Sequence, residues 1–382
     1  MISKIPLFEI CWDEEDIKSV NDVIRRGNYW ATGPEIEKFE KKISNYVGAK
    51  HAVTFNSGTS ALHAILVAYN INHGHEVIVP SFTFTSTANA PLFVGAKPVF
   101  AEIEDKSYGL DPEDVKERIT SKTKVIMPMH YGGCPCMVED LAEIAQDYNL
   151  LFIEDAAEAL GAKINNKLVG NFGDAAMFSF CQNKVISTGE GGCIVTDSDS
   201  IYRKLKLIRS HGRIETRNYF SSREIMDYTM LDYNFRMSTM TAALGISQIA
   251  KINKIIDMRR NIADIMTQKL SEIDEIKVIN PPSNRFNIYQ MYTIRVEEGI
   301  RNELMQYLMD RGIASKVYFP SIHLTSFYKE KFGYGEGDFP VSEEISNQVL
   351  SLPMHPKLKM EHIDYITSSV LGFFGSDILC KI

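Results

Sequence analysis

The sequence predicts an α/β fold, with a mostly parallel seven-stranded sheet flanked by helices and a smaller C-terminal α+β unit. Short runs rich in Val, Ile and Phe alternate with helical patterns between residues 51 and 197, as in strands joined by crossover helices. Beyond Asp232 the pattern changes, and a chain of 382 residues is long enough for two domains. We therefore predict an N-terminal arm and large domain in residues 1–250 and a small domain in residues 251–382.

Seven short apolar runs between the helical patterns are the predicted strands of this sheet. They are Ala52–Phe55, Glu76–Pro80, Pro98–Ile103, Lys124–Pro128, Leu150–Glu154, Ala175–Phe180 and Cys193–Thr196. The first crossover helix is predicted most clearly, because its apolar residues recur at helical spacing and form one stripe facing the sheet. These residues are Leu62, Ile65, Leu66 and Tyr69.

A run of small polar residues, Asn56-Ser57-Gly58-Thr59, precedes that helix. The amides at a helix N-terminus lack acceptors and carry the positive end of the dipole, and small residues let an anion approach them. Ser57, Gly58 and Thr59 are therefore candidates for holding a phosphate group. A plain helix cap explains the same tetrapeptide equally well.

The C-terminal part is predicted as one long helix followed by a smaller mixed unit. The helical pattern runs from Thr239 to Ser271, and a segment rich in Pro, Asn and Ser at residues 279–284 ends it. The elements expected after it are a strand at Met291–Val296, a helix at Arg301–Arg311, a strand at Ala314–Val317 and a terminal helix at Glu361–Leu371.

Composition narrows the class of protein. Hydrophobic residues make up 45% of the chain and charged residues 24%, which matches a globular enzyme. With 41 basic and 49 acidic residues the net charge is −8, and this argues against a nucleic-acid-binding surface. The first ten residues lack a hydrophobic signal core, and no apolar stretch reaches membrane-spanning length. We expect a cytoplasmic protein that binds neither nucleic acid nor membrane.

The six cysteines are scattered without the spacing of a disulfide framework, so a reducing compartment is expected. Cys134-Pro135-Cys136 has no second Cys or His pair at zinc spacing. We therefore predict no metal site and interpret this motif as structural, or at most sensitive to oxidation.

Lys184 follows a predicted strand and precedes the glycine-rich turn Gly189-Glu190-Gly191-Gly192. A lysine leaving a buried strand can form an imine, because desolvation favours the neutral amine. Another apolar run, ending at Glu154, is followed by Asp155. A carboxylate there could hold a pyridinium nitrogen while Lys184 holds the aldehyde carbon of the same cofactor. The alternative for Lys184 is a solvated loop lysine.

Six motifs in a fixed order resemble those of the DegT/DnrJ/EryC1/StrS family, over nearly the whole chain. They are Asn56-Ser57-Gly58-Thr59-Ser60-Ala61-Leu62, Pro80-Ser81-Phe82-Thr83-Phe84, Glu154-Asp155-Ala156-Ala157-Glu158-Ala159, Ser179 with Lys184, Gly189-Glu190-Gly191-Gly192 and Asn234-Phe235-Arg236-Met237. This family comprises sugar aminotransferases that depend on pyridoxal 5'-phosphate (PLP) and have the aspartate aminotransferase fold, fold type I. Its dehydratase branch has histidine in place of the lysine, so Lys184 indicates a transaminase.

The resemblance assigns a role to each matching residue. It implies that Lys184 forms the internal aldimine with PLP and that Asp155 pairs with the pyridine nitrogen. It also implies that the family's homodimer shares its active sites between subunits. The remaining implied contacts are the phosphate with Ser57, Gly58, Thr59, Ser179 and the neighbouring subunit's equivalent of Asn234, the cofactor ring with Phe84, and the substrate with Arg236 and His323. We also expect Arg213 and Tyr318 to bind the substrate.

Some of these residues have ordinary structural interpretations. Phe84 follows a strand, where an aromatic residue usually belongs to the core, and a single histidine such as His323 is usually structural. The basic segment from Arg209 to Arg223, with Arg213 and Arg217, could clamp a diphosphate. It could equally be a solvated loop.

Glu158 departs from the commoner family pattern, in which glutamine or histidine stands at this position. Either of those side chains can donate a hydrogen bond to the phenolic oxygen of the cofactor, whereas an ionised glutamate cannot. We expect Glu158 to be protonated when cofactor is bound, because burial and the neighbouring anionic oxygen both disfavour its charge.

The predicted reaction moves an amino group from L-glutamate to a nucleotide-linked keto-deoxysugar, at C4 of a 4-keto-6-deoxyhexose. This position is an analogy with family members, because the pose of the sugar decides it. A 3-keto sugar or a cyclitol ketone is the alternative substrate. A non-catalytic PLP-binding regulatory protein is the alternative from another class.

Overall fold

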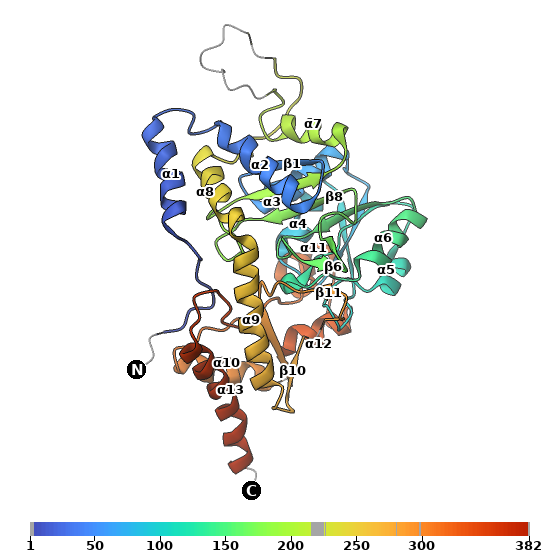
Figure 1. The fold of residues 1–382 in the computed structure, drawn as a ribbon. Coiled ribbons are helices and arrows are strands. Elements are labelled where there is room, and N and C mark those ends of the chain that lie inside the picture. The colour runs from blue at the N-terminus through green and yellow to red at the C-terminus, as the bar shows by residue number, and fades with distance from the viewer. Residues whose placement is uncertain (1–3, 215–224, 226, 280, 298, 381–382) are drawn as a thin grey trace.

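The computed structural model describes residues 4–214, 225, 227–279, 281–297 and 299–380, the last five of them by their backbone alone (Figure 1). Its centre is a seven-stranded sheet in the order β1-β9-β8-β5-β4-β2-β3. The strands are β1 (His51–Phe55), β2 (Glu76–Pro80), β3 (Lys97–Ala101), β4 (Thr123–Ile126), β5 (Leu151–Asp155), β8 (Ala175–Ser179) and β9 (Gly192–Thr196). Only β9 runs antiparallel to its neighbours. The predicted α/β class and mostly parallel seven-stranded sheet are confirmed.

Helices cover both faces of this sheet, which explains why its strands read as continuous apolar runs. One face packs against α3 (Gly58–Ala68), α4 (Thr85–Phe93) and α7 (Asp199–Ile208). The other face packs against α2 (Pro34–Val47) and α8 (Thr239–Ala250) near β1, β9 and β8. Farther along, that face packs against α5 (Pro112–Arg118) and α6 (Val138–Asp147). The carboxyl ends of the parallel strands therefore form one edge of a rigid three-layer core.

The prediction of one continuous helix over residues 239–271 is wrong. The segment forms two helices, α8 and α9 (Ile252–Leu270). They are separated at Lys251, whose φ of −112° is not helical. Lys251 Nζ contacts Asp13 Oδ2 at 2.8 Å and Asp16 Oδ2 at 2.5 Å, beside α1 (Glu14–Arg26). The break lets α8 pack along α1 and α2 while α9 continues toward the C-terminal unit (Figure 1). Apolar periodicity does not register a change of direction at one residue.

The C-terminal unit is built on a second sheet of three antiparallel strands, β10 (Ile276–Val278), β12 (Tyr292–Val296) and β13 (Val349–Leu352). Its core includes residues of α9, α10 (Ile300–Asp310) and α13 (Met360–Cys380). The other elements are α11 (Ser326–Phe332), α12 (Pro340–Gln348), the 3₁₀ turns η1 (Tyr131–Gly133) and η2 (Ile322–Leu324), and the small sheet of β6 (Lys163–Ile164), β7 (Lys167–Leu168) and β11 (Arg285–Phe286).

The strand predicted at Ala314–Val317 is wrong. Two isolated bridges occur there instead, Ile313 with Ile5 and Lys316 with Ser351. Because the segment changes partner within three residues, it cannot form a continuous ladder. The division into residues 1–250 and 251–382 stays a prediction.

Candidate active site

Several of the predicted site residues lie at the C-terminal ends of the strands of the large sheet, where α/β proteins bind their ligands. Asp155 is the last residue of β5, Ser179 is the last residue of β8, and Gly58 begins α3 directly after β1. Lys184 lies in the loop that joins β8 to β9. The strand order places β8 between β9 and β5, so the segments carrying Ser179 and Asp155 are neighbours.

The turn before α3 is both a helix cap and a cradle. Ser57 Oγ accepts a hydrogen bond from the Ser60 amide at 3.1 Å, as the simple cap predicts. The amides of Gly58 and Thr59 lie in the first turn and have no intrahelical acceptor. A Cβ added to Gly58 would lie 3.4 Å from Ser179 Cβ and 3.5 Å from Ser179 Oγ. The backbone of this turn therefore lies close to Ser179, so its amides and the Ser179 hydroxyl are together candidates for binding a phosphate group.

Asp155 is a buried carboxylate supported by two hydrogen-bond donors. Thr87 Oγ1 donates to Oδ2 at 2.7 Å, and the Ala157 amide donates to Oδ1 at 3.1 Å. Burial raises the pKa of Asp155, while these two bonds and the charge of Lys184 oppose the rise. Within the described part of the chain Asp155 forms no ion pair. A cationic N–H group would complete its surroundings.

Lys184 is held close to Asp155 by Glu158. Its Nζ donates to Glu158 Oε1 at 3.0 Å, and the Gly132 amide donates to Glu158 Oε2 at 2.9 Å. The side chains of Lys184 and Glu158 are 14% and 5% exposed, so Lys184 is not a solvated loop lysine. Gln290 Nε2 donates to the Asn183 carbonyl at 2.6 Å, which fixes the loop just before Lys184.

Three aromatic side chains, Phe84, Phe319 and Tyr318, lie next to one another, and Tyr318 lies near Glu158. Phe84 precedes α4 with its side chain 57% exposed, so it is not a core residue. Its ring lies 6.1 Å from Phe319, which in turn lies 5.2 Å from Tyr318. Burial and the negative charge of Glu158 raise the pKa of Tyr318, which places the phenol near the Glu158 carboxylate.

His323 is buried away from solvent. Nδ1 lies 2.5 Å from Ser81 Oγ and Nε2 lies 3.1 Å from Glu343 Oε1, and its exposure is 0%. Burial lowers the pKa of His323, against the charge of Glu343. Both ring nitrogens are thus occupied within the protein, as in a structural histidine, and the predicted substrate contact would require this arrangement to open.

The segment predicted to clamp a diphosphate is only partly described. Arg209 is wrong as a clamp, because its guanidinium is 1% exposed, binds Glu40 and donates to the Thr54 carbonyl at 2.9 Å. A buried arginine needs such partners, and they hold it inside. Arg213 is half-buried, with its amide 3.3 Å from the Ser210 carbonyl. Arg217 and Arg223 lie outside the described residues.

Two more predicted residues lie on the strand-like segment after the clamp region. Asn234 is exposed and forms a bridge with Ser210, and Arg236 Nη1 donates to Ser210 Oγ at 3.0 Å. Between them, the Phe235 carbonyl accepts a hydrogen bond from the Asn56 amide at 2.8 Å. This bond ties the segment to the start of the phosphate turn.

Sequence analysis missed the hydroxyl groups that support the site. Thr87 bonds Asp155, Thr83 lies 2.9 Å from Thr87, and Ser86 lies 2.7 Å from Thr59. A threonine pair four residues apart at the start of a helix was the available signal. Its meaning depends on Asp155, which is 68 residues away.

The Cys134-Pro135-Cys136 motif lies in the interior of the protein. Both cysteines are buried, and burial raises the pKa of Cys134 to about 12, which makes it unreactive. Over the described residues there is no cluster of three metal-ligating side chains, and none of the helices there is long and apolar enough to cross a membrane.

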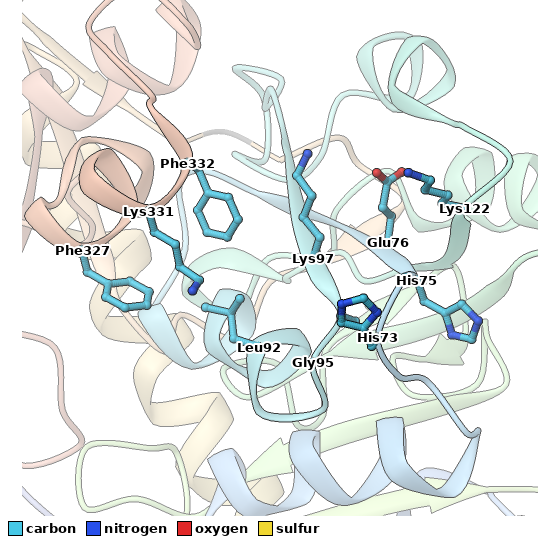
Figure 2. Close-up of a pocket in the computed structure, with 12 residues that line it drawn as sticks. His73, His75, Glu76, Leu92, Gly95, Lys97, Lys122, Phe327, Lys331 and Phe332 are labelled. Carbon is cyan, nitrogen blue, oxygen red and sulfur yellow. The ribbon is translucent and has the colours of Figure 1, made fainter.

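A separate cleft of about 450 Å³ lies at the opposite edge of the sheet (Figure 2). Glu76 and Lys97, which begin β2 and β3, line it together with Phe327, Lys331 and Phe332 of α11. None of the predicted site residues belongs to its lining. The strands separate this cleft from Asp155 and Lys184.

Comparison with known proteins identifies the family. Residues 10–371 match the DegT/DnrJ/EryC1/StrS aminotransferase family. The chain belongs to this family. It is 34% identical to the GDP-perosamine synthase of Vibrio cholerae over 377 residues, which cover 97% of this chain and 99% of that protein. It is a PLP-dependent sugar aminotransferase, as the sequence predicted.

Two solved aminotransferases share its fold. PseC of Helicobacter pylori, involved in pseudoaminic acid biosynthesis, has a TM-score of 0.92 and 29% identity, and the match covers 98% of this chain and 100% of PseC. DesV of S. venezuelae, solved with a ketimine intermediate, has a TM-score of 0.90 and 30% identity, with 97% and 98% covered. These matches confirm the predicted aminotransferase fold.

The site geometry fits PLP. The Gly58 turn offers backbone amides close to the Ser179 hydroxyl, Asp155 offers a buried acceptor to a pyridinium nitrogen, and Lys184 offers an amine. Phe84 is exposed and directly precedes α4, the helix that carries the Thr87 partner of Asp155. When bound, the cofactor supplies an electron sink for the charge released at the substrate carbon.

Proposed function

We propose that this aminotransferase transfers the amino group of L-glutamate to C4 of a nucleotide-linked 4-keto-6-deoxyhexose, with Lys184 holding PLP through an imine bond. The ion pair of Lys184 with Glu158, enclosed beside Asp155 at the carboxyl edge of the sheet, is the observation that carries the proposal. It brings an amine and two carboxyl groups together at a largely buried site, where the lysine can act as the nucleophile toward an aldehyde.

Each residue then has a task. Asp155, kept ionised by Thr87 and Ala157, holds a proton on the pyridine nitrogen. Lys184 would hold the cofactor, and its amine, when free, could move a proton at the substrate carbon as base and then acid. Gly58, Thr59 and Ser179 bind the phosphate, and Phe84 fixes the ring by stacking.

The substrate assignment draws on relatives. The name GDP-perosamine synthase records a GDP-linked sugar for the Vibrio cholerae protein, so a nucleotide sugar is the favoured substrate class. Binding energy from the nucleotide can orient the sugar ring. We assign Arg236, Arg213, Tyr318 and His323 to substrate binding, of which Tyr318 is supported by its position near Glu158. A 3-keto sugar or cyclitol is the second candidate.

A homodimer with shared active sites, in a cytoplasmic location, is part of the proposal. Exposed apolar side chains on and beside α1 support the dimer, because a monomer rarely leaves such a group uncovered. They are Trp12, Ile17, Ile24 and Trp30, which are 43–53% exposed. Asn234, also exposed, would reach the phosphate of the neighbouring subunit.

The function is tested with purified holoprotein. Glutamate should bleach the visible imine band, and subsequent nucleotide-linked 4-keto sugars should yield an amine product by mass spectrometry. The same sugar without its nucleotide should react far more slowly, because the remote binding energy is lost. Product only from 3-keto sugars or cyclitols would refute C4 amination. A band that glutamate leaves unchanged would favour the regulatory alternative.

Substitution of Glu158 by glutamine tests the predicted protonation of this residue. Glutamine keeps the size of the side chain and can always donate a hydrogen bond, but it cannot ionise. Titration of the visible band should therefore contain an ionisation in the wild type that Glu158→Gln lacks. Coincident titration curves for the two proteins would contradict a protonated Glu158.

A further inference from the structure

Thr87 connects the Asp155 carboxylate to the start of α4. Its Oγ1 donates to Asp155 Oδ2 at 2.7 Å, and the two residues are 1% and 3% exposed. The bond links residues 68 positions apart in the chain. It is therefore a tertiary contact made inside the protein.

A second threonine extends this hydrogen bond into a chain of two hydroxyl groups. Thr83 Oγ1 lies 2.9 Å from Thr87 Oγ1, and Thr83 is 1% exposed. An ionised carboxylate only accepts hydrogen bonds, so Thr87 must give its single hydroxyl proton to Asp155. Thr83 must then donate to Thr87. The two hydroxyls form a relay that points toward Asp155 and matches its ionised form.

The relay leaves Asp155 able to accept further donors. Oδ2 receives the Thr87 hydroxyl and Oδ1 receives the Ala157 amide at 3.1 Å. Because each carboxylate oxygen can accept two hydrogen bonds, both retain a free acceptor direction. One donor on each oxygen fixes the orientation of the carboxylate plane. Hydrogen bonds in a chain of hydroxyl groups also strengthen one another in a low-dielectric interior.

Thr83 and Thr87 belong to the same short segment as Phe84. Thr83 and Phe84 are consecutive, and Phe84 directly precedes α4, whose first turn contains Thr87. One rigid segment therefore presents an aromatic ring at the surface and two hydroxyls in the interior. It can set the ring face and the acceptor of the cofactor nitrogen relative to each other.

We propose that Thr87, backed by Thr83, is a positioning residue that orients the Asp155 carboxylate toward the pyridine nitrogen of PLP and keeps it ionised. The proposal rests on the proposed pairing of Asp155 with that nitrogen. It is independent of the amino acceptor. Burial raises the pKa of Asp155 and the Thr87 bond is the strongest opposing influence, which agrees with this role.

The decisive comparison is between Thr87→Val and Thr87→Ser. Valine keeps the shape of threonine without its hydroxyl, whereas serine keeps the hydroxyl. A hydrogen bond to a charged group is worth about a ten-fold change in an equilibrium. We expect Thr87→Val to bind PLP about ten-fold more weakly and to shift the titration of its visible band, and Thr87→Ser to remain close to the wild type.

A second readout uses the protein without cofactor. Carbon-13 NMR of labelled aspartate, assigned with Asp155→Asn, follows the Asp155 carboxyl group directly. Loss of the donor should move its titration to higher pH in Thr87→Val but not in Thr87→Ser, because the ionised form has lost a partner. Thr85→Val is the matched control, since Thr85 lies in the same turn with an exposed side chain.

Unchanged PLP affinity and an unchanged Asp155 titration in Thr87→Val would overturn the proposal. If this variant does not fold, Thr83→Val decides, with a smaller shift in the same direction expected and no shift refuting the relay. Absence of the imine band in the wild type itself would instead indicate that the proposed function has failed. An unexpected sugar specificity would leave these measurements unaffected.

Discussion

Replacement of Lys184 by alanine should reduce transamination by at least about 10⁴-fold, because one residue supplies both the imine partner and the proton carrier. The rate is measured in a single turnover with glutamate, in which the decrease of the visible band is recorded over time. In the wild type, borohydride reduction should attach the cofactor to the peptide containing Lys184, and mass spectrometry locates the added mass.

Lys184→Arg is the matched control for this experiment. Arginine retains a positive charge for Glu158, whose carboxylate now accepts from Lys184 Nζ at 3.0 Å. Its guanidinium stays protonated and cannot form the imine. Both variants should therefore be inactive, with Lys184→Arg the more stable. Full activity in either variant, or reduction that labels another lysine, would disprove the assignment.

Replacement of Asp155 by asparagine should lower turnover by about 10²- to 10³-fold, the effect of removing one member of a buried charge pair. Asparagine keeps the shape but not the negative charge that holds a proton on the pyridine nitrogen. Stopped-flow measurement of band loss with glutamate isolates this half of the reaction. A rate equal to that of the wild type would contradict the role of Asp155.

The same variant should have the opposite effect on the stability of the cofactor-free protein. Burial raises the pKa of Asp155 in the folded state, so the unfolded chain holds fewer protons across the interval between the two pKa values. Stability then falls as pH rises through that interval, and the deficit persists above it. At neutral pH, cofactor-free Asp155→Asn should melt at or above the wild-type temperature, although holo Asp155→Asn melts below holo wild type.

The strands of the large sheet were predictable because helices cover both faces. A strand buried on both sides reads as an uninterrupted apolar run, and Glu76–Pro80 agrees to the residue with β2. Elements outside this sheet gave weaker signals. The segments of α11 and α12 are short and largely polar, and their helical state depends on packing against Phe100 and Glu102 of the large sheet's edge.

Charge and residue type do not predict the environment of a side chain whose partner lies far along the chain. Arg209 was assigned to a basic surface segment, but Glu40 lies 169 residues away and draws the guanidinium into the core. His323 is proposed to bind substrate, and its two nitrogens lie beside Ser81 and Glu343, 242 and 20 residues away. The cost of burying an unpaired polar group makes such partners obligatory, and sequence spacing does not reveal them.

The sequence by itself determined the order of the strands along the chain, the position of Lys184 and Asp155 after apolar runs, and the motifs that mark the family. These features are local, because burial and backbone propensity act on consecutive residues. Only the tertiary structure decided which side chains meet. The pairing of Lys184 with Glu158, the relay from Thr83 through Thr87 to Asp155 and the burial of His323 join residues from separate elements, and their contacts exist only once the sheet and its helices have packed.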